Sequence, residues 1–294
     1  MLLLALAWIS LGCSDMSCST SRVRKTRDGR TFVFDSCANA WRLDDSSMEK
    51  AEAWEQLALP WSQFNVSFQG QFQIAGIPIL LGEDPDRRPQ GSQEHADTGN
   101  SIWDGAVALA KVLERQPQLV RGRKVLELGA GRGLAGLAAS ALGADVVLTD
   151  LAYCREAMEQ AVRLTTGSQA LVSSRVEVAE LDWLQAEAFF ESRPELKLDV
   201  VLAADVVWLM DLVEPLADAI RVAAGYNPQV EILVVHQTRS SNVERAFLEA
   251  MTARDLRLKW TVAGDSHGHV QWHEDFVPDQ RIKLWCFHLP DTAG

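Results

Sequence analysis

The chain has little positive charge and few cysteines. Lysine and arginine number 28 against 40 aspartates and glutamates, which gives 294 residues a net charge of -12. Because binding to a phosphate backbone needs cations that release counterions, we expect no general affinity for nucleic acid. The five cysteines, Cys13, Cys18, Cys37, Cys154 and Cys286, are scattered and show no metal-ligand spacing. Neither a disulfide framework nor a zinc site is therefore predicted.

The N-terminus lacks an apolar run long enough to cross a bilayer. Leu2 to Leu11 form a run of signal-peptide length that no positive residue precedes. The following Gly12-Cys13-Ser14 is a poor match to a cleavage site. We therefore expect a cytoplasmic monomer without membrane contact. The alternative is a protein that its apolar and basic N-terminus targets to an organelle.

Two regions differ in composition. Residues 1–60 are mixed, serine-rich and charged, and predict a loosely structured N-terminal extension. Residues 61–294 predict one domain, since a chain with 47% hydrophobic residues can bury a substantial core. From Asn65 the stretch FNVSFQGQFQIAGIPILL predicts a β-hairpin. Gly82 to Gly99 is polar and rich in proline and glycine, and predicts a loop.

Apolar runs then alternate with helical patterns, which is typical of parallel strands joined by crossover helices. The predicted strands are Lys124–Leu128, Asp145–Thr149, Arg175–Ala179, Asp199–Ala203 and Glu231–His236. The predicted helices are Ile102–Arg115, Leu134–Leu142, Arg155–Leu164, Gln185–Glu191, Leu212–Ala224 and Val243–Ala253. The pattern predicts a doubly wound α/β sheet. Leu256–Val262 and Arg281–His288 lack a helix between them, so they predict an antiparallel hairpin at the sheet edge.

The first of these strands leads into a glycine-rich turn, Gly129-Ala130-Gly131-Arg132-Gly133. Glycine permits φ > 0 and leaves backbone N–H groups open to a ligand. In a doubly wound sheet this turn lies at the carboxyl ends of the strands, where ligands bind. The second strand ends in Asp150, whose carboxylate can accept both hydroxyls of a ribose. A tight turn with an exposed strand-end aspartate is the purely structural alternative.

The spacing of the glycines separates two classes of ligand. Dinucleotide sites use G-x-G-x-x-G to hold a pyrophosphate, whereas here one residue separates the last two glycines. S-adenosylmethionine carries no phosphate but does carry an ammonium and a sulfonium. The carboxylates of Glu127, Asp150 and Asp205 suit such a cation. We therefore favour S-adenosylmethionine as the cofactor over a nicotinamide dinucleotide.

The glycine turn together with Glu127 resembles the E/D-x-G-x-G-x-G motif of class I, seven-β-strand, S-adenosylmethionine-dependent methyltransferases. Four flanking segments are similar to those of the small protein-lysine methyltransferases of the family 16 type. They are Thr98-Gly99-Asn100-Ser101-Ile102-Trp103-Asp104, Leu181-Asp182-Trp183, LDVVLAADVVW from Leu198 to Trp208, and His236-Gln237-Thr238-Arg239. The resemblance covers roughly Asn65 to Leu289 and implies a Rossmann-like sheet.

The resemblance also implies the residues of the cofactor site. These are Trp103, Glu127, Gly129, Ala130, Gly131, Asp150, Trp183 and Ala204. Asp150 would bind the ribose, Trp183 would lie beside the adenine, and Trp103 would close over the methionine end. A role as core residues is the alternative for both tryptophans.

Two further residues are expected to act in catalysis. Asp205 would orient the target amine, with a helix cap as its alternative role. Trp208 stands where the family has tyrosine or phenylalanine, and would wall the channel for the target ammonium. Tryptophan has the strongest cation–π face, but its larger ring narrows such a channel.

The function that we predict is transfer of a methyl group to a lysine side chain of a protein substrate. The alternatives are a methyltransferase for another nucleophile (histidine, an N-terminal amine or a small molecule) and a non-catalytic module in which Trp208 blocks the channel. No metal is expected. His267, His269 and His273 cluster in a polar loop without a nearby cysteine, where contact with a substrate is as good an explanation.

Overall fold

The computed structural model describes the strands Val23–Lys25, Thr31–Asp35 and Ala40–Leu43, and residues 63–64, 66–82, 99, 101–167, 176–264 and 270–290. The chain divides into two compact units, Met1–Pro60 with Ser92–Ala96, and Trp61–Gly91 with Asp97–Gly294. In the first unit β1 (Val23–Lys25), β2 (Thr31–Asp35) and β3 (Ala40–Leu43) form an antiparallel sheet. These strands lie in a segment for which the composition predicted only loose structure.

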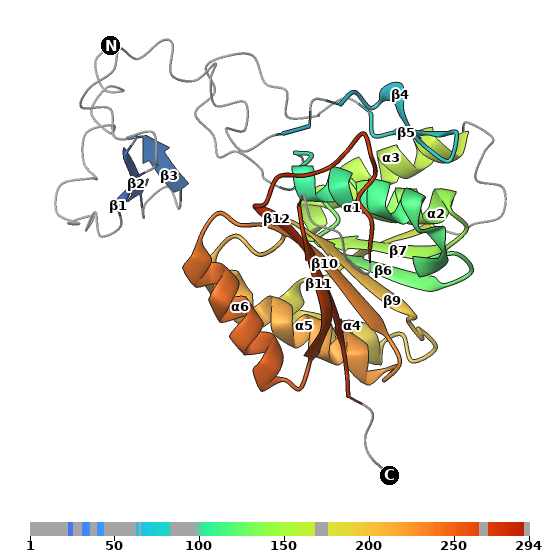
Figure 1. Cartoon of the computed structure of the whole chain (residues 1–294). Helices are drawn as coiled ribbons and strands as arrows, with labels where there is room; N and C mark the ends of the chain where they lie inside the picture. The colour runs from blue at the N-terminus through green and yellow to red at the C-terminus, as the bar shows by residue number, and fades with distance from the viewer. Residues whose placement is uncertain are drawn as a thin grey trace, which may run out of the picture. The chain divides into compact units, whose positions relative to one another are not determined.

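The second unit is built on a seven-stranded sheet with the order β11-β12-β10-β9-β6-β7-β8 (Figure 1). The parallel strands are β6 (Lys124–Leu128), β7 (Asp145–Asp150), β8 (Val176–Glu180), β9 (Val200–Ala204) and β10 (Glu231–Gln237). The antiparallel strands are β11 (Arg257–Ala263) and β12 (Ile282–His288). The predicted doubly wound sheet with an antiparallel edge hairpin is thus confirmed.

Helices cover both faces of this sheet (Figure 1). The helices α1 (Asp104–Arg115), α2 (Leu134–Ala141) and α3 (Arg155–Gly167) contribute to one apolar cluster. The helices α4 (Ala186–Glu191), α5 (Val213–Gly225) and α6 (Ser241–Ala253) contribute to the other. Successive residues of the central strands alternate between the clusters, as Val125 and Leu126 do. A parallel strand covered on both faces is mostly apolar, which explains the apolar runs of these strands.

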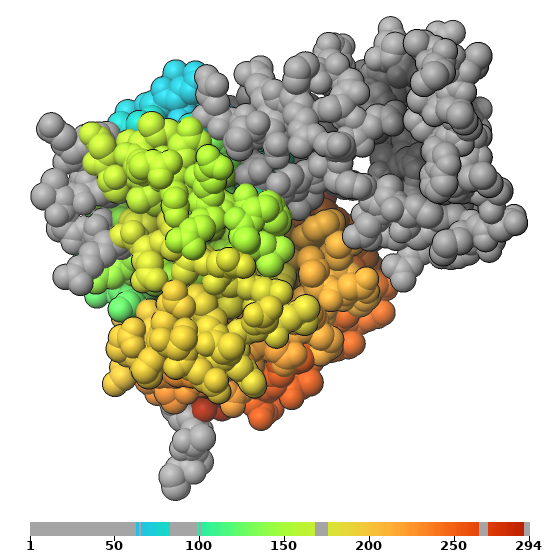
Figure 2. Space-filling view, turned by 180° about the vertical axis from the view of Figure 1, so that it is seen from behind, coloured from blue at the N-terminus to red at the C-terminus, as the bar shows by residue number. Residues whose placement is uncertain are grey.

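The view from behind shows the side of the molecule on which α3 and α4 lie (Figure 2). The yellow-green segment that contains α3 borders the yellow segment that contains α4 on this side. Both segments follow strands at the β7–β8 end of the sheet.

In the described part of the chain, every helix is too short or too polar to cross a bilayer.

The predicted hairpin is also present, as β4 (Gln69–Ile74) and β5 (Ile77–Leu80). Its turn residues Ala75 and Gly76 both have positive φ, as the favoured two-residue hairpin turn requires. The ammonium of Lys111 in α1 lies 4.8 Å from the ring centre of Phe72 and 5.1 Å from that of Phe276. This cation therefore joins α1 to the hairpin and to the loop before β12.

Two details of the topology position the site. The chain runs from β6 to β7 on one side and reaches β9 on the other, so the strand order reverses beside β6. Helix α1 begins at Asp104, two residues later than predicted, because Trp103 has an extended backbone with φ -100° and ψ 149°. The side chain of Trp103 is therefore presented by a loop at the start of the helix.

The packing of α6 on the sheet gives a test of the fold. Phe247 is fully buried, and its ring centre lies 5.8 Å from Trp285 and 6.1 Å from Phe287. Phe247→Ala should lower the free energy of unfolding by about 3–5 kcal/mol, because it leaves a cavity in a rigid cluster. Leu258→Ala on β11 is the matched control, since Leu258 is 46% exposed, and should change it by less than about 0.5 kcal/mol. Urea unfolding followed by circular dichroism measures both, and equal losses would contradict this packing.

Candidate active site

A cavity of about 560 Å³ opens at the carboxyl ends of β6, β7, β8 and β9. All the residues predicted for the site line it: Trp103, Glu127, Gly129, Ala130, Gly131, Asp150, Trp183, Ala204, Asp205 and Trp208. Motifs that are up to 105 residues apart in the sequence therefore meet in one place. Their individual roles stay predictions.

Neighbouring protein atoms lie very close to the backbone of the glycine turn after β6. Gly129 and Gly131 have φ of 65° and 56°, in the left-handed region that disfavours side chains. A Cβ on Gly129 would lie 2.6 Å from a methyl group of Val206, and one on Gly131 would lie 2.5 Å from the Gly99 carbonyl oxygen. Both positions thus exclude a side chain for steric as well as conformational reasons, and the backbone faces the cavity bare.

Asp150 ties the end of β7 to the glycine turn. Its Oδ2 accepts a hydrogen bond from the Gly131 N–H at 2.7 Å, and its Oδ1 accepts one from the Leu151 N–H at 2.7 Å. Burial raises the pKa of this carboxyl, and these backbone hydrogen bonds oppose the rise. Each carboxylate oxygen has a second lone pair, so Asp150 can still accept hydroxyl donors from a ligand.

Glu127 lies at the end of β6, where its carboxyl is covered by α2. Its carboxyl is buried and accepts a hydrogen bond from the Gly136 N–H of α2 at 2.7 Å. Burial raises its pKa to about 8, and the nearby charge of Asp150 adds to the rise. Glu127 lines the cavity, and its role toward a ligand stays a prediction.

Asp205 is held by three elements at once. Its Oδ2 accepts from the Gly105 N–H at 2.7 Å, and its Oδ1 accepts from the Gln237 N–H at 2.9 Å and from Arg239 at 3.2 Å. The residue itself has φ 57°, which is unusual without glycine. Gly105 lies in the first turn of α1, so the carboxylate satisfies one of the free N–H groups of that turn from the segment that follows β9. Orientation of the target amine and the helix-cap alternative both stay predictions.

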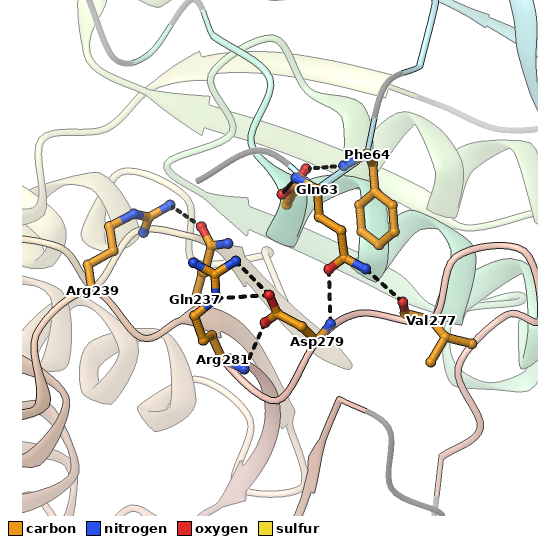
Figure 3. Close-up of polar contacts among 8 residues, drawn as sticks. Gln63, Phe64, Gln237, Arg239, Val277, Asp279 and Arg281 are labelled. Atoms are coloured by element: carbon orange, nitrogen blue, oxygen red, sulfur yellow. Dashed lines mark hydrogen bonds and ion pairs between the residues drawn. The ribbon is translucent and has the colours of Figure 1, made fainter. Parts of the chain in front are cut away.

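Arg239 connects this hydrogen-bond network to the ring of Trp103. Its guanidinium carbon lies 4.9 Å from the ring centre of Trp103, and its Nη2 donates to the Gln237 side chain at 3.2 Å (Figure 3). The side chain of Gln63 reaches the main chain of Val277 and Asp279 in the same region (Figure 3). The backbone of Phe64 donates to Asp104 at 3.0 Å, so α1 is anchored on this side too.

The cationic side chains among the described lining residues are Arg132 and Arg239. Arg132 donates to the carbonyl oxygen of Leu81, and Arg239 pairs with Asp205. Both are thus engaged by the protein itself. A ligand without phosphate groups fits this arrangement better than a dinucleotide.

The predicted loop of histidines is described only in part. His267 and His269 lie outside the described residues, and His273 packs edge-on against Phe276 with ring centres 5.7 Å apart. The described residues hold no group of three or more metal-ligating side chains.

The sequence prediction missed several lining residues, including Leu151, Tyr153, Leu184 and Asp211. Each of them follows the carboxyl end of a strand, and that position was the one signal available for them.

Comparison with known proteins links this cavity to one family. A family model described as lysine methyltransferase matches residues 90–254. The chain is 32% identical over 149 residues to EEF1A lysine methyltransferase 3 of Xenopus tropicalis, covering 50% of the chain and 62% of that protein. It is 36% identical over 110 residues to protein N-lysine methyltransferase METTL21A of Danio rerio, covering 37% and 47%.

A third relative is named for a different activity. The chain is 29% identical over 151 residues to histone-arginine methyltransferase METTL23 of Mus musculus, covering 50% of the chain and 56% of that protein. The chain thus matches less than two thirds of the length of each of these three relatives.

The raised pKa of Glu127 predicts a pH-dependent stability. Because the folded state holds its proton up to about pH 8 while an unfolded glutamate titrates near pH 4.5, stability should fall as pH rises between these values. Glu127→Gln cannot ionise and keeps an acceptor for Gly136, so it should lose less stability over this range. Urea midpoints at pH 5, 6.5 and 8 compare the two proteins. Parallel pH profiles would show that Glu127 is ionised in the folded state.

Proposed function

The chain belongs to the lysine methyltransferase family, and on that basis we propose that it transfers a methyl group from S-adenosylmethionine to a lysine side chain of a protein. The observation that carries this proposal is the meeting of the glycine turn, Asp150, Trp103, Trp183 and Trp208 in one cavity. The cavity lies beside the switch point of the sheet, where open α/β sheets bind ligands.

The cavity suits the proposed cofactor in shape and charge. Gly129 and Gly131 line the cavity with backbone alone, so a ligand could approach their main chain closely. Asp150 can accept two ribose hydroxyls while it keeps its backbone hydrogen bonds. Trp183 borders the glycine turn, because a Cβ on Gly129 would lie 3.2 Å from its ring. An adenine could stack on such an apolar face.

The remaining predicted residues shape the site in the same proposal. Ala204 is small and leaves room at the end of β9, and Ala130 presents its backbone beside the two glycines. Trp103 closes the methionine end. Glu127 acts through Gly136, by holding α2 and the glycine turn together.

When bound, S-adenosylmethionine supplies a methyl group on a positively charged sulfur. The chain has to position a neutral amine in line with that methyl group and exclude water, which provides most of the rate. Trp103 and Trp208 would form apolar walls, and the Trp208 face would attract the incoming ammonium. The amine must lose a proton to solvent or to a carboxylate before it attacks.

Asp205 orients the amine indirectly in this proposal. Its carboxylate is buried, and both of its oxygens already accept hydrogen bonds from the protein. We therefore assign it a positioning role, because it holds α1 and Arg239, and hence Trp103, against the cavity. A protein partner that bears the target lysine follows from the proposal. Monomeric state and cytoplasmic location stay predictions.

Binding of S-adenosylhomocysteine tests the cofactor site. Asp150→Ala should weaken binding about 10–100-fold, since a hydrogen bond to a charged group contributes about 1.5–3 kcal/mol. Asp145→Ala is the matched control, because Asp145 is exposed at the opposite end of β7, and should leave binding unchanged. Isothermal titration calorimetry measures both variants. Unchanged affinity of Asp150→Ala would remove Asp150 from the site.

Methyl transfer tests the function itself. The protein is incubated with tritiated S-adenosylmethionine and a cell lysate, and labelled bands are hydrolysed and analysed for methylated residues. We expect methyl-lysine, and we expect Asp150→Ala to reduce the label strongly when the cofactor concentration is below the dissociation constant of the variant. Methyl-histidine or methyl-arginine would assign another acceptor. Cofactor binding without any labelled band would favour the non-catalytic module.

A further inference from the structure

Exposed apolar side chains gather at the mouth of the cavity. Among the described residues, seven large apolar side chains are exposed; three of them line this cavity, and a fourth directly precedes a lining residue. They are Leu151 at 43%, Tyr153 at 50%, Leu184 at 77% and Met210 at 46% exposure. Single exposed apolar residues are common on protein surfaces, but a group around one opening marks an interaction site. We refer to these four residues as the apolar rim.

The apolar rim is contributed by three strand ends. Leu151 and Tyr153 follow β7, Leu184 lies in the short helix η5 (Trp183–Gln185) after β8, and Met210 begins η6 (Met210–Leu212) after β9. Both short helices contact α5. Leu151, Tyr153 and Leu184 line the cavity directly, and Met210 precedes the lining residue Asp211. The apolar rim is therefore continuous with the cavity in which transfer would occur.

The mouth also carries negative charge. Asp182 and Asp211 line it, and Asp211 is exposed. The two described cations of the lining do not balance these carboxylates, because Arg239 pairs with Asp205 and Arg132 donates to the Leu81 carbonyl oxygen. An approaching chain therefore meets apolar contacts beside unneutralised carboxylates.

We propose that the apolar rim with Asp211 docks a protein segment in which a large apolar residue and a basic residue flank the target lysine. This proposal rests on the proposed function and deepens it. Charge complementarity favours a basic segment, since basic side chains would meet Asp182 and Asp211. A second copy of this chain is a poorer occupant, because the net charge of -12 makes two copies repel each other.

The test uses three fluorescent peptides of equal length with one central lysine. The lysine is flanked by leucine and arginine, by leucine and glutamate, or by serine and arginine. Fluorescence anisotropy, with and without S-adenosylhomocysteine, measures their dissociation constants. We expect the first peptide to bind about tenfold more tightly than either of the others, since it loses neither the apolar contact nor the charge contact.

Variants of the protein assign the preference to the apolar rim. Leu184→Ser should remove the preference for leucine over serine, and Asp211→Asn should reduce the preference for arginine over glutamate. Leu258→Ser is the matched control on β11, away from the cavity lining, and should preserve both preferences. Equal binding of the three peptides, or the same result for Leu184→Ser and Leu258→Ser, would overturn the proposal.

Two further measurements separate the possible failures. Sedimentation equilibrium would show a dimer that Leu184→Ser dissociates if a second copy were the occupant, and that result would also overturn the proposal. Titration with S-adenosylhomocysteine on the same preparations reports the cofactor site. Failure of that titration would count against the proposed function, whereas a normal titration without peptide preference would count against the docking surface alone.

Discussion

The arrangement of the cavity depends on one buried carboxylate. Asp205 accepts hydrogen bonds from the first turn of α1, from the end of β10 and from Arg239, and its side chain is only 1% exposed. A buried charge is tolerated when several donors satisfy it, and a helix N-terminus is a favourable place for an anion. The left-handed backbone of Asp205 is the conformational cost of this position. Trp103 and Arg239 stand where they do because Asp205 holds their segments together.

Asp150 and Glu127 lie near the ends of neighbouring strands, but burial and hydrogen bonding give their carboxyl groups different environments. Asp150 lies at the cavity with two backbone donors, so it can remain an acceptor for hydroxyl groups. Glu127 lies beneath α2 with a single donor, and burial raises its pKa to about 8. Asp150 therefore ties the end of β7 to the glycine turn, and Glu127 ties the end of β6 to α2. The mouth above them combines apolar contacts with the charge of Asp182 and Asp211.

The sequence predicted most of the fold, because parallel strands covered by helices leave strong periodic patterns. The ends of the elements were less certain, and α1 starts two residues later than predicted since Trp103 is extended. The place of β12 between β10 and β11 could not be predicted, because the order of strands depends on contacts distant in sequence. The rim residues Leu184 and Met210 were missed for the same reason. The sequence around an apolar residue does not show whether its side chain is buried or exposed.

The sequence by itself determined the glycine turn, the carboxylate after β7 and the tryptophans of the motifs, because backbone sterics and residue chemistry act locally. The tertiary structure decided which carboxyl has a pKa raised to about 8, which one accepts from the first turn of α1 and which one lines the cavity with backbone donors on both oxygens. Those properties follow from burial and from donors contributed by other segments, as Gly105 and Gln237 are for Asp205. The sequence specifies the chemical type of each residue. Their pKa values and hydrogen-bond partners depend on contacts between strand ends that are distant in the sequence.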